Sequence, residues 1–103
     1  MFGMRALLFS LLVLGAFPAR ADPATERYAP AQLRVANDLL ESARAAAARG
    51  DSALAGKLAW QASFDARLAW GMSDSPELRG DAAEVGTAAS ALIRRLAARA
   101  SRP

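Results

Sequence analysis

Two alanine-rich segments on either side of the short sequence Gly50-Asp51-Ser52 restrict the fold of this chain most strongly. In residues 30–49 and again in residues 52–70, apolar residues recur at spacings of 3 and 4, which is typical of one face of an α-helix. Gly50 can end the first helix in a left-handed conformation, and Asp51 or Ser52 can cap the second. Because the connection is so short, we expect the two helices to form an antiparallel hairpin.

The side chains expected to face each other across this hairpin are mostly small. They are Leu33, Ala36, Leu40, Ala43 and Ala47 in the first helix, and Ala55, Leu58, Ala62, Ala66 and Ala69 in the second. Pairing the helices about the turn places Leu40 opposite Gln61 and Ala62. Since helix spacing depends on the side chains at the contact, we expect the two backbones to approach closely.

Residues 76–100 carry a third helical pattern, which Ser75 can cap and Pro76 can begin. Its apolar residues repeat at spacings of 4 and 3: Leu78, Ala82, Val85, Ala89, Leu92 and Leu96. Gly80 and Gly86 each disfavour a helix by about 1 kcal/mol relative to alanine, so we expect fraying in the first half or a later start. No alternating strand pattern occurs, and the prediction is an all-α fold, a helical hairpin plus a third C-terminal helix in a small three-helix bundle.

Residues 1–21 have the three parts of a cleavable signal peptide. Arg5 gives a positive start, Ala6 to Phe17 form an uncharged apolar run, and Ala19-Arg20-Ala21 supplies small residues for cleavage. The apolar run would extend roughly 18 Å as a helix, short of the ~30 Å hydrocarbon core of a membrane. We therefore expect cleavage after Ala21 and secretion to an extracytoplasmic space, most simply a bacterial periplasm.

After cleavage the chain would keep a net charge of only +1, because Arg5 and Arg20 are removed. Residues 22–29 begin with Asp22-Pro23 and have no helical period, so we expect a flexible leader there. Residues 30–103 should then form a single helical domain. With no cysteine in the chain, helix packing rather than disulfides must stabilise it.

The residue types that most enzymes need are scarce. The chain has no histidine and no cysteine, and Lys57 is its single lysine, so no serine has an ordinary base beside it. Asp38 and Glu41 are spaced to pair with Arg34 and Arg44 along an exposed helix face, which is a more ordinary role than acid-base catalysis. We expect no enzyme activity, no cofactor, no metal site and no small-molecule substrate.

Several short motifs together resemble the bacterial envelope family named domain of unknown function 4398, over residues 26–70. They are Tyr28-Ala29-Pro30-Ala31-Gln32-Leu33, then Ala36, Leu40, Ala43 and Arg49-Gly50-Asp51, then Leu58-Ala59, Gln61-Ala62, Asp65-Ala66 and Leu68-Ala69. Members of that family are secreted envelope proteins with an alanine-rich helical hairpin after a signal or lipoprotein leader. The resemblance implies this fold and location. Because the family has no agreed activity, the resemblance does not indicate one for this chain.

Large apolar side chains of the second helix form the first candidate binding site: Trp60, Phe64, Leu68 and Trp70. Two tryptophans in so small a domain can anchor a protein interface. The alternative is that the third helix covers them and they belong to the core. If they are free, we expect a non-enzymatic interaction or structural module of the cell envelope that docks a partner helix or associates with itself.

Arginines near the C-terminus form the second candidate site: Arg94, Arg95, Arg99 and Arg102. They accompany Leu92, Ile93 and Leu96 in an amphipathic pattern that could bind an anionic envelope surface or membrane peripherally. The alternative is that these cations only complement the helix dipole. We expect no nucleic-acid partner, because the leader directs the chain out of the cytoplasm.

Overall fold

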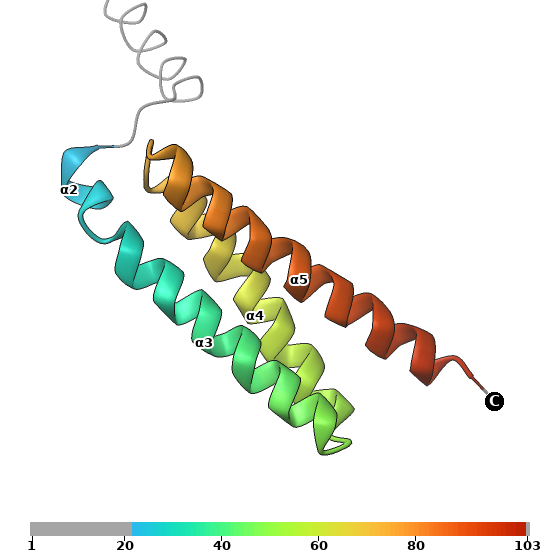
Figure 1. Ribbon diagram of the computed structural model, residues 1–103. Coiled ribbons are helices and arrows are strands. Elements are labelled where there is room, and N and C mark those ends of the chain that lie inside the picture. Colours follow the sequence, from blue (N-terminus) through green and yellow to red (C-terminus); the bar gives the residue numbers. More distant parts are fainter. Residues whose placement is uncertain (1–21, 103) are drawn as a thin grey trace, which may run out of the picture.

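The computed structural model describes residues 22–102 as a helical bundle (Figure 1). Its helices are α2 (Pro23–Glu26), α3 (Ala29–Ala48), α4 (Ser52–Gly71) and α5 (Pro76–Ala100). No strand occurs within these described residues, which confirms the all-α prediction, and the three long helices begin and end close to the expected residues. The expected signal peptide, residues 1–21, lies outside the described part of the chain.

The turn between α3 and α4 reverses the chain as its sequence predicts. Gly50 has a φ of 85°, and its backbone N–H donates to the Ala47 carbonyl at 3.0 Å while that of Asp51 donates to the Ala46 carbonyl at 2.9 Å. This pair of bonds is the glycine-ended helix stop known as a Schellman motif. The Asp51 side chain then accepts from the backbone N–H of Leu54 at 3.1 Å, so α4 begins at once and runs antiparallel to α3.

The core consists mainly of alanine. One cluster of buried residues, near the middle of the bundle, contains Ala36, Leu40, Ala62, Ala66, Val85 and Ala89. A second cluster, nearer the α3–α4 turn, contains Ala43, Ala46, Ala55, Ala59, Leu92 and Leu96. Leu40 and Ala62 share a cluster, as the pairing about the turn predicts. Near the turn, Ala46 and Ala59 are buried where Ala47 and Leu58 were expected, and the latter two are only partly buried.

Helix α5 is continuous from Pro76, so the expected fraying around its glycines is wrong. The Ser75 hydroxyl accepts from the backbone N–H of Leu78 at 3.2 Å and caps the helix. Gly86 faces α4, where a Cβ on it would lie 3.9 Å from the Ala66 Cβ. Packing of the expected seam against α4 and α3 thus outweighs the low helix propensity of the two glycines.

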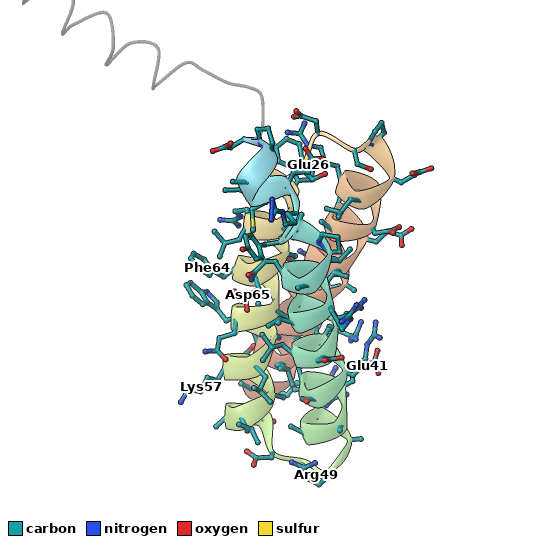
Figure 2. The ribbon with its side chains drawn as sticks, turned by 90° about the vertical axis from the view of Figure 1, so that its left-hand side faces the viewer. Glu26, Glu41, Arg49, Lys57, Phe64 and Asp65 are labelled. Atoms are coloured by element: carbon teal, nitrogen blue, oxygen red, sulfur yellow. The ribbon has the colours of Figure 1, made fainter. Side chains whose placement is uncertain are left out.

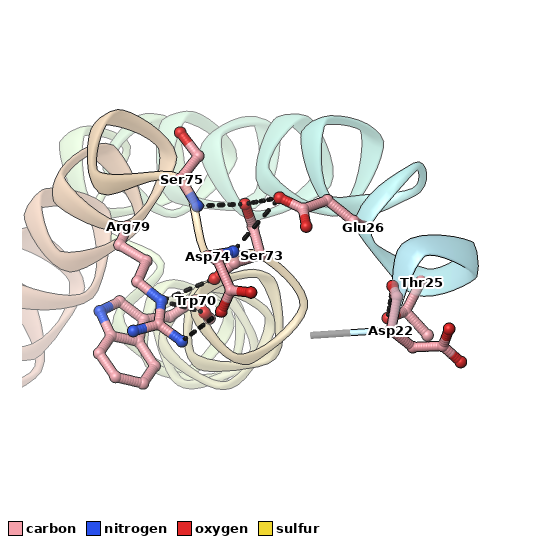
Figure 3. A network of polar contacts seen from close by, with 8 residues as sticks. All are labelled: Asp22, Thr25, Glu26, Trp70, Ser73, Asp74, Ser75 and Arg79. Carbon is pink, nitrogen blue, oxygen red and sulfur yellow. Dashed lines mark hydrogen bonds and ion pairs between the residues drawn. The ribbon is translucent and has the colours of Figure 1, made fainter. Parts of the chain in front are cut away.

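Residues 22–29, expected to be a flexible leader, contain a short helix that contacts the bundle. Residues 23–26 form α2, which Asp22 caps by accepting from the backbone N–H of Ala24 at 3.3 Å. Glu26 then binds the α4–α5 connection, where its Oε2 accepts from the Ser73 hydroxyl at 2.9 Å (Figure 3). Ala29, at the start of α3, is completely buried. This segment owes its order to contacts with residues distant in sequence.

None of the helices in the described part of the chain combines the length and the apolar content needed to cross a bilayer.

Candidate functional site

The outward side of α4 carries an exposed apolar stripe made of Trp60, Phe64 and Leu68, called here the α4 stripe. Trp60 is 64% exposed, Phe64 49% and Leu68 43%. Figure 2 places Phe64 at the outer edge of the bundle. Helix α5 therefore does not cover these residues, and the alternative that they belong to the core is wrong.

The side chains of Trp60 and Phe64 lie against each other. Their ring centroids are 6.3 Å apart and the ring planes differ by 4°, which is a parallel, offset arrangement. The two residues are four positions apart, the spacing at which helical side chains meet. The stripe thus presents two aromatic rings that already restrict each other's motion before any partner binds.

Cations accompany the α4 stripe. Lys57 is exposed one turn before Trp60, and Arg67 is exposed one turn after Phe64. Asp65 is the one acidic residue of α4, and it is only partly exposed. Figure 2 draws Lys57 pointing away from the bundle on this helix. The stripe is therefore an apolar surface with a positive border.

The alanine face of α4 explains why the aromatic residues stay outside. Residues Ala55, Ala59, Ala62, Ala66 and Ala69 are buried between α3 and α5. Small side chains permit the shortest distance between helix axes, so both neighbouring helices pack on this face. At 100° per residue, the α4 stripe lies on the side of the helix opposite to this face.

Trp70 does not belong to the α4 stripe, contrary to the expected four-residue site. It lies ten residues after Trp60, which turns it by about 80° away from that side chain on the helix. The guanidinium carbon of Arg79 is 3.9 Å from the centroid of the Trp70 ring. Trp70 is 44% exposed, and Arg79 from the start of α5 lies over its ring.

Arg79 connects α5 to the end of α4 (Figure 3). Its Nε donates to the Ser73 carbonyl at 2.6 Å and to the Trp70 carbonyl at 3.2 Å, and its Nη2 lies 3.7 Å from Asp74 Oδ1. The sequence analysis did not single out Arg79, because an arginine in the first turn of a helix carries no motif. Its contact with Trp70, nine residues earlier in the chain, forms only when the α4–α5 connection has folded.

The four C-terminal arginines are all exposed: Arg94, Arg95, Arg99 and Arg102. The apolar residues expected to help them bind a surface are not free, since Leu92 is 5% exposed and Leu96 8% exposed. Ile93 is partly buried against the same cluster. The apolar half of the expected amphipathic surface is therefore part of the bundle core.

A groove of about 360 Å³ lies between α4 and α5. Its lining residues are Ser63, Ala66, Arg67 and Trp70 of α4, and Ala82, Ala83, Gly86, Thr87, Ser90 and Arg94 of α5. Of the expected site residues, the groove brings together Trp70 and Arg94, which the sequence analysis had placed in two different sites. The sequence signal that could have found it is the run of small and polar residues at spacings of 3 and 4 in α5.

The acidic side chains of the described residues form no cluster suited to a metal ion. No group of His, Cys, Asp or Glu side chains within residues 22–102 could hold a metal ion. Glu41 forms an ion pair with Arg44 at 2.9 Å, and both side chains are at least half exposed. This is the surface pairing that the sequence predicts for these charges.

No family model matches this chain, and no curated protein or solved structure shows significant similarity to it. The resemblance to domain of unknown function 4398 stays a prediction.

Proposed function

We propose that this protein is a non-enzymatic helical module of the bacterial cell envelope that binds an amphipathic partner helix on the α4 stripe. The observation that carries the proposal is the exposure of Trp60 and Phe64 as a stacked pair on a helix whose other side is fully packed. Tryptophan is one of the residue types enriched at the energetic hot spots of protein interfaces. The signal-peptide pattern of residues 1–21 and the family resemblance support a periplasmic location.

The shape and charge of the stripe favour one kind of partner. Residues at spacings of 4 along α4 match the apolar residues of a second helix laid beside it, as in helix-in-groove recognition. Lys57 and Arg67 border the stripe, so the partner helix should carry acidic residues beside its own apolar stripe. A partner helix with basic borders would be repelled.

A photo-crosslinking residue at position 60, introduced into the full-length protein in intact cells, tests this function. We expect an adduct whose mapped contact is an amphipathic helix with acidic borders, and its loss when Phe64→Ser is added. A crosslinker at Glu41, which is exposed on α3, provides the matched control and should give no such adduct.

Absence of an adduct from position 60, or identical adducts from positions 60 and 41, would contradict the proposal. If the adduct forms only with a second copy of the chain, the α4 stripe mediates self-association and does not bind a different partner. The Trp60→Ala/Phe64→Ala variant should keep its helical circular dichroism and its unfolding midpoint, because both side chains are exposed. If this variant unfolds, the stripe is structural.

A further inference from the structure

The groove between α4 and α5 is separate from the α4 stripe and has the size of a ligand site. Its volume of about 360 Å³ lies within the ~300–1,000 Å³ typical of small-molecule pockets. None of Trp60, Phe64 and Leu68 lines it. A ligand held there would leave these three side chains uncovered, and Arg67 is the one residue that both lines the groove and borders the α4 stripe.

One end of the groove is polar and positive. Thr87, Ser90 and Arg94 follow one another at spacings of 3 and 4 on α5, so they share one side of that helix. Ser63 and Arg67 of α4 line the same groove. No aspartate or glutamate is among the lining residues. The cation of Arg94 and the hydroxyl groups of Ser63, Thr87 and Ser90, without a carboxylate, suit an anionic group at this end. Arg67 lies farther along the groove, one turn before Trp70.

The other end of the groove is apolar and includes an oriented aromatic ring. Because α4 and α5 are antiparallel, Trp70 near the end of α4 lies across from Ala82 and Ala83 near the start of α5. The Arg79 guanidinium lies over the Trp70 ring and restricts its rotation. From Ala83 to Arg94 the helix rises about 16 Å, so Arg94 is well separated from the Trp70 ring, which Arg67 and Arg79 border.

We propose that this groove binds a small amphipathic anion, a carboxylate or phosphate monoester attached to a short apolar body. The anionic group lies among Ser90, Thr87 and Arg94, and the apolar body lies along Gly86 toward Trp70. Gly86 leaves room for the apolar body, since a Cβ there would already reach van der Waals contact with the Ala66 Cβ at 3.9 Å.

Phenyl phosphate is the probe, and the Trp60→Phe variant of the full chain is the background, so that Trp70 is the sole tryptophan. We expect saturable quenching of Trp70 fluorescence by phenyl phosphate, confirmed by calorimetry and weakened by added salt. Arg94→Gln should weaken binding about tenfold or more, as loss of a charge-assisted hydrogen bond does. The matched control, Arg95→Gln, removes an exposed neighbouring cation outside the groove and should leave binding unchanged.

A second variant separates a binding defect from a folding defect. Gly86→Ala should weaken phenyl phosphate binding while leaving the urea midpoint unchanged or higher, since its Cβ takes up room in the groove without a clash and favours the helix. Inorganic phosphate should bind more weakly than phenyl phosphate, and benzyl alcohol should not bind.

Four outcomes would overturn the proposal: no saturable response, an equal response to benzyl alcohol, equal losses in Arg94→Gln and Arg95→Gln, or binding to vesicles of phosphatidylglycerol without any response to phenyl phosphate. The last result would assign the arginines to a membrane surface. Under this proposal, Arg94→Gln leaves crosslinking from position 60 unchanged. The ligand-binding groove and the helix-docking α4 stripe are therefore tested independently.

Discussion

The carboxylate of Glu26 and the hydroxyl of Ser73, 47 residues apart in the chain, are joined by a hydrogen bond of 2.9 Å. Ser73 is the one buried polar residue of the described chain, with 1% of its surface exposed. Its Oγ also accepts from the backbone N–H of Ser75 at 3.0 Å, and Glu26 Oε2 receives the backbone N–H of Asp74 at 3.3 Å. The short helix α2 is thereby fixed to the connection between α4 and α5.

Replacing Glu26 with alanine should release α2 from the bundle. The change removes the acceptor for the Ser73 hydroxyl and the Asp74 amide, so we expect a loss of about 1–2 kcal/mol in the free energy of unfolding. Urea unfolding measures this loss, and faster amide exchange at Asp74 locates it. Glu41→Ala is the control, since its ion pair is exposed and contributes little. Equal losses in the two variants would mean that the α2 contact does not stabilise the fold.

The sequence predicts the long helices well because their ends carry local signals. Gly50 with Asp51, and Ser75 with Pro76, adopt the stop and cap conformations that these residue types favour. The short segment α2 begins with a similar signal, Asp22-Pro23, but four residues are too few to form a stable helix alone. Its order depends on Glu26 reaching Ser73, a contact that exists only after α3 and α4 have folded back on each other.

Which side of α4 is buried could not be decided from periodicity. The helix offers an alanine face and an aromatic stripe, and the α5 seam of Val85, Leu92 and Leu96 could pack on either. The alanine face is buried because it lets both α3 and α5 pack close to α4, whereas the rings of Trp60 and Phe64 would keep a neighbouring helix farther away. The groove was missed for a related reason, since its lining combines residues of two helices.

Replacing Gly50 and Gly80 with alanine should change stability in opposite directions. Gly50 has a φ of 85°, where an L side chain costs about 1–2 kcal/mol, so Gly50→Ala should lower the free energy of unfolding by that amount. Gly80 lies within α5 with no atom near its Cβ position, so Gly80→Ala should raise it by about 0.5–1 kcal/mol. Parallel urea titrations check both signs. A gain for Gly50→Ala would show that the turn tolerates another conformation.

Enlarging a single buried alanine of α4 should disrupt the packing of both neighbouring helices. Ala62 is completely buried in the cluster that contains Leu40 and Val85. Ala62→Leu should therefore lower the free energy of unfolding by about 1–3 kcal/mol. Ala53→Leu is the matched control, because Ala53 is exposed on the same helix and has nothing to displace.

Urea unfolding gives the stability of both variants, and amide exchange in α5 reports whether that helix separates from α4. If Ala62→Leu is as stable as Ala53→Leu, the close approach of helices on the alanine face is not what keeps the aromatic stripe exposed. In that case the preference of α5 for this face must come from the Arg79 contacts at the α4–α5 connection.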